Sequence, residues 1–183
     1  RRMRMFRNHG IGSDHRTREK EGSWYYEMTD LGYNYRLTDF QCALGMSQLG
    51  KLAGWISRRR EIAARYNNAF AVLGSVAPLS VRRDVLHAYH LYVILLDLLR
   101  LRSGRAGIFA GLRAEGIGVN VHYVPVHLHP FYKKRFGTGP GLCPISEAAY
   151  QRVLSLPMFP RMSDADVETV IVAVKKVVEA NAA

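Results

Sequence analysis

The feature that most constrains the fold of this 183-residue chain is an apolar run at residues 88–95, Ala-Tyr-His-Leu-Tyr-Val-Ile-Leu. Its aromatic and branched side chains are typical of a β-strand, and the run has no polar face that could stay in contact with water. We therefore expect a strand in the middle of a sheet. A shorter strand is predicted before it, at Ala77–Ser80.

A long amphipathic helix is predicted before these strands. It begins at Thr38, whose hydroxyl pairs with the Gln41 side chain in a capping box, and its apolar stripe continues to Leu73. The glycines between positions 50 and 54 predict an interruption of this helix.

A second amphipathic helix is predicted at the carboxyl end. Ser163 and Asp166 mark its start, and its apolar stripe consists of Val167, Val170, Ile171, Val174, Val177 and Val178. The other predicted elements are a loop at residues 8–21, a helix at 108–114, a strand that starts at Val119 and leaves the sheet by Pro125, and a helix at 146–154. This order predicts a small α/β lobe with an antiparallel or mixed sheet.

The chain is strongly basic, with 26 Lys and Arg residues against 15 Asp and Glu residues, a formal charge of +11 and a pI near 10.0. This charge favours an anionic partner such as nucleic acid, acidic lipid or a phosphorylated small molecule. Cys42 and Cys143 have no zinc-site or disulfide-framework spacing, so a reducing cytoplasm is the expected location. No run is long enough to cross a bilayer and no secretory signal is recognised. We expect that Arg1 is not the biological first residue.

Two polar segments are candidate ligand sites. Residues 32–36, Gly-Tyr-Asn-Tyr-Arg, directly precede a predicted helix start, where an amide, an arginine and free backbone N–H groups suit a phosphate; a turn that packs aromatic rings is the alternative. Residues 122–132 contain three histidines and two tyrosines that could line a polar pocket, with a surface loop as the alternative. Zinc is disfavoured, because this segment has no Cys, Asp or Glu.

Two further features predict binding without catalysis. Arg58, Arg59 and Arg60 could contact nucleic acid, although a solvated helix face is the simpler interpretation. The aromatic side chains between Trp24 and Tyr35 could form an interface. A basic nucleic-acid-binding domain and a non-catalytic scaffold or oligomerisation domain therefore stand as alternatives to an enzyme.

Four ordered blocks, Trp24–Glu27, Leu31–Gly45, Arg58–Tyr66 and Val121–His127, resemble the DegT/DnrJ/EryC1/StrS family of sugar aminotransferases. The resemblance extends from Arg1 to about Val178. Within the family, the stretch up to Leu156-Pro157-Met158-Phe159-Pro160 is most similar to one branch. The enzymes of that branch aminate C4 of UDP-linked 4-keto-6-deoxy-N-acetylhexosamines in pseudaminic acid and spore-coat polysaccharide synthesis.

The resemblance implies the type I fold of aminotransferases that use pyridoxal 5'-phosphate (PLP). Residues 1–74 would form the end of the large PLP domain, with a dimer-interface loop and long linking helices, and residues 75–183 the small carboxy-terminal α/β domain. The implied activity is ping-pong transamination of a nucleotide-linked 4-keto-6-deoxy sugar in a homodimer, with glutamate as the expected donor. The block that carries the family's Schiff-base lysine lies upstream of the matched residues, so this chain is expected to be inactive alone.

The resemblance also implies roles for individual residues. Asn34 matches the asparagine that reaches across the dimer to the phosphate of the neighbouring subunit's cofactor. Arg36, His122, Tyr123 and His127 match positions that line the nucleotide-sugar site, and Tyr123 and His127 are the preferred substrate contacts. No catalytic residue, metal site, nucleic-acid partner or membrane partner is expected in this chain.

Overall fold

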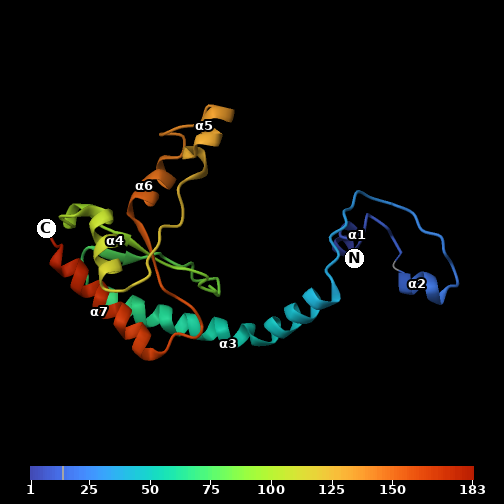
Figure 1. The fold of residues 1–183 in the computed structure, drawn as a ribbon, viewed down its shortest axis with the longest axis horizontal. Coiled ribbons are helices and arrows are strands. Elements are labelled where there is room, and N and C mark those ends of the chain that lie inside the picture. Colours follow the sequence, from blue (N-terminus) through green and yellow to red (C-terminus); the bar gives the residue numbers. More distant parts are fainter. Residues whose placement is uncertain (14) are drawn as a thin grey trace. The chain divides into compact units, whose positions relative to one another are not determined.

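The computed structural model describes residues 1–13 and 15–183, which form two compact units, Arg1–Leu52 and Ala53–Ala183 (Figure 1). Helix α3 (Asp39–Phe70) runs from the first unit into the second. Its capping box is confirmed, because the Gln41 backbone N–H donates to Thr38 Oγ1 at 3.3 Å and Gln41 Oε1 accepts from the Thr38 N–H at 2.9 Å. The interruption predicted at residues 50–54 is wrong: two glycines each cost about 1 kcal/mol, which a helix of 32 residues tolerates.

The first unit contains two short helices, α1 (Arg2–Phe6) and α2 (His15–Lys20). The loop predicted at residues 8–21 is therefore wrong over its second half, and its residue Asp14 lies outside the described residues. Helix α2 has no buried residue, so the missing apolar period that suggested a loop is the pattern of an exposed helix.

The second unit is built on an antiparallel sheet of order β1-β2-β3, with β1 at Val76–Pro78, β2 at Tyr92–Leu96 and β3 at Val153–Leu156. The predicted central strand is thus confirmed, although it starts at Tyr92 rather than Ala88. Tyr89 has a φ of +48°, and Arg59 Nη1 donates to the Tyr89 and His90 carbonyls at 2.8 and 3.0 Å. The positive φ of Tyr89 is incompatible with the extended backbone of a strand, so the strand can begin only after it.

Strand β3 corrects the predicted helix at 146–154, since α6 (Pro144–Arg152) ends where the strand begins. All four β3 residues are buried, and pairing with β2 overrides their helical spacing. The strand predicted from Val119 is reduced to one bridge between Asn120 and Ser155. The chain then forms the 3-10 helix η2 (Val126–Leu128) and the unpredicted helix α5 (Pro130–Phe136).

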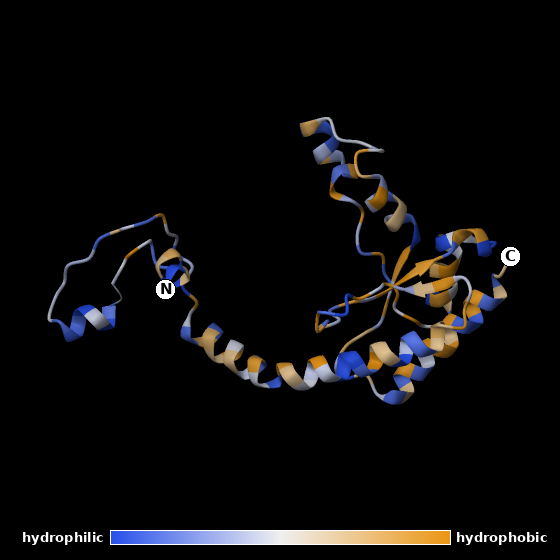
Figure 2. Ribbon diagram, turned by 180° about the vertical axis from the view of Figure 1, so that it is seen from behind, coloured by the Kyte–Doolittle hydropathy of each residue, from blue (hydrophilic) through white to orange (hydrophobic). Residues whose placement is uncertain are grey.

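Helices α4 (Gly104–Ala114) and α7 (Asp164–Ala180) contact each other and share the core with the sheet, whose strands are apolar in Figure 2. The predicted α7 start is confirmed by a complete capping box between Ser163 and Asp166. Its buried side chains include the whole predicted stripe. Helix α3 contributes Ile62, Tyr66 and Phe70, all fully buried.

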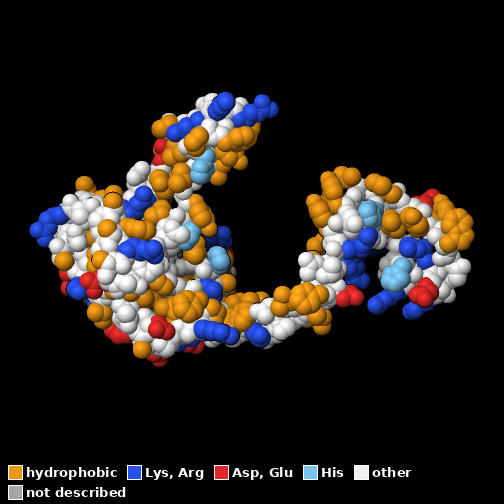
Figure 3. Space-filling view, viewed as in Figure 1, with side chains coloured by type: hydrophobic (Ala, Val, Ile, Leu, Met, Phe, Trp, Pro, Cys, Tyr) orange, Lys and Arg blue, Asp and Glu red, His pale blue; other side chains and the backbone are white. Residues whose placement is uncertain are grey.

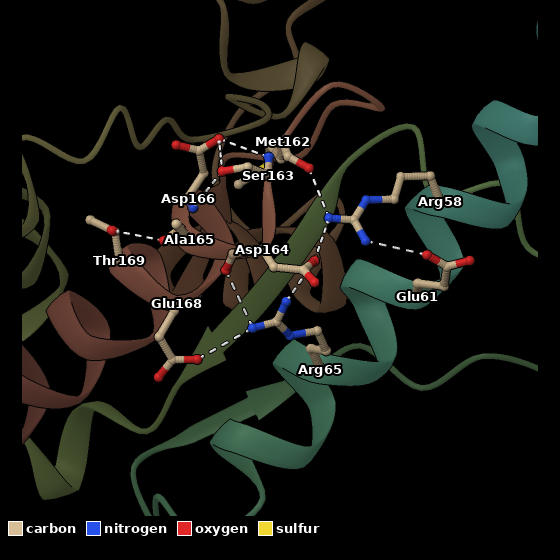
Figure 4. A network of polar contacts seen from close by, with 10 residues as sticks. All are labelled: Arg58, Glu61, Arg65, Met162, Ser163, Asp164, Ala165, Asp166, Glu168 and Thr169. Carbon is tan, nitrogen blue, oxygen red and sulfur yellow. Dashed lines mark hydrogen bonds and ion pairs between the residues drawn. The ribbon is translucent and has the colours of Figure 1, made fainter.

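An ion-pair network connects the start of α7 to α3 (Figure 4). Asp164 Oδ1 lies 2.7 Å from Arg58 Nη2 and 2.9 Å from Arg65 Nη1, and Arg58 also donates to the Met162 carbonyl at 2.8 Å. Arg59 is held by backbone carbonyls. Two of the three arginines that suggested a nucleic-acid surface therefore bind groups of the fold itself. No helix in the described part of the chain combines the length and hydropathy needed to cross a membrane.

Candidate functional site

The segment that carries Asn34 and Arg36 is held against the end of α1 by backbone hydrogen bonds. The Tyr33 N–H donates to the Phe6 carbonyl at 2.7 Å, and the Tyr35 N–H donates to the Arg7 carbonyl at 2.9 Å. Gly32 makes this approach possible, since a Cβ there would lie 1.9 Å from the Gly10 nitrogen.

Asn34 presents a free amide beside this contact. The Tyr33 and Tyr35 rings stack at 5.2 Å with an interplanar angle of 12°, so in an extended segment the side chains of Asn34 and Arg36 lie on the opposite face. Asn34 is exposed, and its side chain has no hydrogen-bond partner among the described residues. Arg36 Nη1 donates to Asn8 Oδ1 at 2.8 Å.

A basic hollow of about 1340 Å³ adjoins this segment in the first unit. Figure 3 shows Arg and His side chains gathered around the helices that enclose it. None of its described lining residues is acidic, so its electrostatic potential favours anions. Its basic lining consists of Arg1, Arg4, Arg7, His9, His15, Arg16, Arg18 and Arg36.

In the second unit, His122 and Tyr123 lie together at the edge of β3. His122 Nδ1 is 2.8 Å from Ser155 Oγ, and its Nε2 is 3.3 Å from Asn120 Nδ2. The Tyr123 ring meets the His122 ring edge to face, with centroids 4.6 Å apart. Tyr123 is 74% exposed, so it is the accessible member of this pair.

His127 is buried and, with Glu147 of α6, holds the loop at 137–143 rather than lining an open pocket. Its Nε2 lies 2.8 Å from Glu147 Oε1, while its carbonyl accepts from Thr138 Oγ1 at 2.8 Å. Glu147 also accepts from the Gly141 and Cys143 N–H groups. The Gly141 N–H, followed by the His127 side chain, lowers the pKa of the Glu147 carboxyl.

The five predicted site residues therefore divide between the units: Asn34 and Arg36 in the first, and His122, Tyr123 and His127 in the second. Sequence reasoning missed Asn120, Glu147 and Ser155. None of them belongs to a motif; Asn120 lies two positions before His122, whereas only chain folding brings Ser155 and Glu147 to the histidines. No group of three metal-ligating side chains occurs in the described residues, and no lysine there is buried or lines the basic hollow.

Comparison with known proteins identifies one family. The model of the DegT/DnrJ/EryC1/StrS aminotransferase family matches residues 1–175. The chain is 43% identical to the uncharacterized protein MJ1066 of Methanocaldococcus jannaschii over 98% of its own length and 47% of that protein. It is 40% identical to the spore coat polysaccharide biosynthesis protein SpsC of Bacillus subtilis, over 97% of this chain and 46% of SpsC. The chain thus spans about half the length of these relatives.

Solved structures of aminotransferases also match this chain. PseC of Helicobacter pylori, an aminotransferase involved in the biosynthesis of pseudoaminic acid, matches with a TM-score of 0.77 and 29% identity, covering 97% of this chain and 45% of PseC. Spr1654 of Streptococcus pneumoniae in its PMP form matches with a TM-score of 0.79 and 29% identity, covering 97% of this chain and 44% of that structure.

Proposed function

Because this chain belongs to the DegT/DnrJ/EryC1/StrS aminotransferase family and has the fold of type I PLP-dependent aminotransferases, we propose that it is the later half of a sugar aminotransferase. The observation that carries this proposal is the family match over residues 1–175. The enzyme aminates the C4 ketone of a nucleotide-linked 4-keto-6-deoxy sugar for glycan synthesis. The functions stated for SpsC and PseC support the pathway class.

The residues of the first unit suit the phosphate of PLP. The Asn34 amide can donate hydrogen bonds and has no partner among the described residues, and its neighbour in the segment, Arg36, lines the basic hollow. We assign Asn34 to the cofactor phosphate of the partner subunit in a homodimer. When bound, PLP supplies the electron sink that transamination requires. Residues 1–74 would then be the end of the large domain and residues 75–183 the small domain.

Arg36 and the basic hollow support an anionic substrate, which we propose is a UDP-sugar with glutamate as the amino donor. Arginine binds phosphate oxygens through two parallel hydrogen bonds, so a diphosphate suits this lining. Tyr123 and His127 are the proposed contacts in the small domain, and His122 is proposed as a residue that lines the same site. The buried His127 would act there through the loop that it holds with Glu147.

The reaction needs a lysine from outside this chain. The six lysines present are Lys20, Lys51, Lys133, Lys134, Lys175 and Lys176, and none lies in the context that the family's lysine requires. We therefore propose that the chain is inactive until it is joined to the lysine-bearing half.

A second candidate function is a non-catalytic oligomerisation module. Trp24 is 85% exposed and Phe40 is 80% exposed, and aromatic residues of this kind are common in protein interfaces. A chain that associates with itself and never binds PLP would favour this candidate.

The test compares the chain alone with the complete enzyme that contains it. Each is incubated with PLP, glutamate and a UDP-4-keto-6-deoxy-N-acetylhexosamine, and amino-sugar formation is measured. We expect turnover only by the complete enzyme. In that enzyme, Asn34→Ala should weaken PLP binding roughly tenfold, as loss of a charge-assisted hydrogen bond does. Asn68→Ala, which changes an exposed asparagine on α3, is the matched control. Turnover by the isolated chain would refute the lysine argument, and equal PLP affinity in both variants would refute the role of Asn34.

A further inference from the structure

Both ring nitrogens of His122 face polar side chains that no motif predicted. Ser155 Oγ lies 2.8 Å from Nδ1, and Asn120 Nδ2 lies 3.3 Å from Nε2. Ser155 is only 4% exposed and belongs to β3, so its hydroxyl has a fixed position. Ser155 pairs with Val93 of the central strand on one side and with Asn120 on the other.

The orientation of the Asn120 amide follows from a backbone group. The Val121 N–H can only donate, and it lies 2.8 Å from Asn120 Oδ1. The other end of the amide, Nδ2, is therefore the one that faces His122, and it too can only donate. His122 Nε2 must accept that hydrogen bond, so in the neutral ring the proton resides on Nδ1 and is donated to Ser155 Oγ.

This arrangement leaves His122 without a free nitrogen for a ligand. To bond a substrate oxygen, the ring would have to abandon Ser155 or Asn120, and a buried hydroxyl that loses its partner is costly. The Tyr123 ring, in contrast, rests on the His122 ring, and Tyr123 is exposed. The hydroxyl of Tyr123 has no hydrogen-bond partner among the described residues.

We propose that Asn120 and Ser155 are positioning residues that lock the His122 imidazole as a fixed platform for Tyr123, and that Tyr123, not His122, contacts the substrate. This inference rests on the proposed function for the identity of the substrate. The lock itself is a property of residues 120–123 and 155, whose backbones are joined by two hydrogen bonds, Asn120 N–H to Ser155 O at 3.2 Å and Ser155 N–H to Asn120 O at 2.8 Å.

The lock is tested by NMR on the ¹⁵N-histidine-labelled chain at about pH 8, where an imidazole is neutral. Two-bond and three-bond couplings identify which nitrogen of His122 carries the proton. We expect the Nδ1–H form alone in the wild type and a mixture of both forms in Asn120→Ala, because the Asn120 Nδ2 donor is what requires Nε2 to accept. Ser155→Ala should keep the Nδ1–H form, because a hydroxyl can donate or accept and does not select the tautomer. Ser75→Ala removes another buried serine of this sheet region and should leave His122 unchanged. An Nε2–H wild type, or an Asn120→Ala spectrum like the wild type, would overturn the proposal.

A double-mutant cycle in the complete enzyme tests whether the fixed His122 ring positions Tyr123 for substrate binding. The probe is UDP-N-acetylglucosamine. We expect Ser155→Ala to weaken binding roughly three- to tenfold when Tyr123 is present. In a Tyr123→Ala background the same change should have less than roughly a twofold effect, because Ser155 acts through the edge-to-face contact between the His122 and Tyr123 rings. Equal effects in both backgrounds would show that Ser155 acts elsewhere and would overturn the positioning role.

The two proposals fail in different ways. If the complete enzyme does not bind UDP-N-acetylglucosamine at all, the proposed substrate class is wrong, while the tautomer of His122 still decides the lock. If the probe binds and His122 is not held in the Nδ1–H form, the lock is wrong and the substrate class stands.

Discussion

Asp164, the first residue of α7, accepts a hydrogen bond of 2.7 Å from Arg58, which lies 106 positions earlier on α3. The Arg58 hydrogen bond, followed by its charge, lowers the pKa of the Asp164 carboxyl below its ordinary 3.8. The same oxygen is 2.9 Å from Arg65, so one carboxylate joins two turns of α3 to the start of α7.

We expect Asp164→Asn to lower the free energy of unfolding at neutral pH. In acid, the variant and the wild type should be equally stable. Because the pKa is lower in the folded chain, the ion pair stabilises the fold above the ordinary pKa and is lost as the pH falls through the folded pKa. Urea unfolding at neutral pH and below about pH 3 measures this. Glu21→Gln, at an exposed carboxylate with no ion pair in the described residues, is the control. A deficit that is equal at both pH values would contradict the assignment.

Gly32→Ala should detach the Asn34 segment from α1. The new Cβ would lie 1.9 Å from the Gly10 nitrogen, and such overpacking costs roughly 1–3 kcal/mol. Hydrogen exchange should therefore become faster at the Tyr33 and Tyr35 N–H groups, which donate across this contact. Gly139→Ala is the matched control, since a Cβ there meets no atom within 4 Å. Unchanged protection in Gly32→Ala would show that the segment tolerates the side chain.

Tyr66→Phe should cost about 1 kcal/mol, because the buried phenol donates to the Pro157 carbonyl at 3.0 Å. Burial also raises the pKa of Tyr66 above its ordinary 10.0. The unfolded chain therefore loses its proton first, so the free energy of unfolding falls as the pH rises above about 10. The variant should have a shallower alkaline decline in thermal unfolding experiments. Tyr132→Phe, at a tyrosine that is 38% exposed, should match the wild type in both respects.

Glu147→Gln should loosen the loop at 137–143 without unfolding the sheet. The carboxylate accepts from two backbone N–H groups and from His127, and an amide can replace these contacts only in part. We expect faster hydrogen exchange at Gly141 and Cys143, whereas the Ser155 N–H in β3 keeps its protection. The wild type should approach the same state in acid, since the pKa of Glu147 is lowered and its carboxylate contacts are lost as that pKa is crossed. Exchange at Ser155 that rises in parallel would mean that the loop and sheet unfold together.

The sequence predicts well those elements whose patterns involve residues close together in the chain. The capping boxes at Thr38 and Ser163 and the apolar stripe of α7 depend on residues a few positions apart, and the structure contains them. Strand β3 was missed because its four residues become a strand only by pairing with β2, about 60 positions earlier. Long-range pairing leaves no periodic mark in so short a segment.

For the candidate site, the positions of the residues could be predicted and their surroundings could not. The resemblance identified Asn34, Arg36, His122, Tyr123 and His127 by position, but it could not give their surroundings. The exposure of Tyr123 and the burial of His127 depend on partners such as Ser155 and Glu147, which lie 20 to 33 positions away. Composition could not separate the arginines of the basic hollow from Arg58 and Arg59, which bind groups within the fold.

The short sheet of the second unit has a consequence for its behaviour at high concentration. Strand β1 spans only three residues and ends at Pro78, which has no N–H to offer. The far side of β3 is occupied by Asn120, which uses both the N–H and the carbonyl of Ser155. Neither border therefore presents a long row of unsatisfied backbone groups to a foreign strand. The sheet is protected from edge-to-edge aggregation by the same Asn120 backbone that brings its side chain to His122.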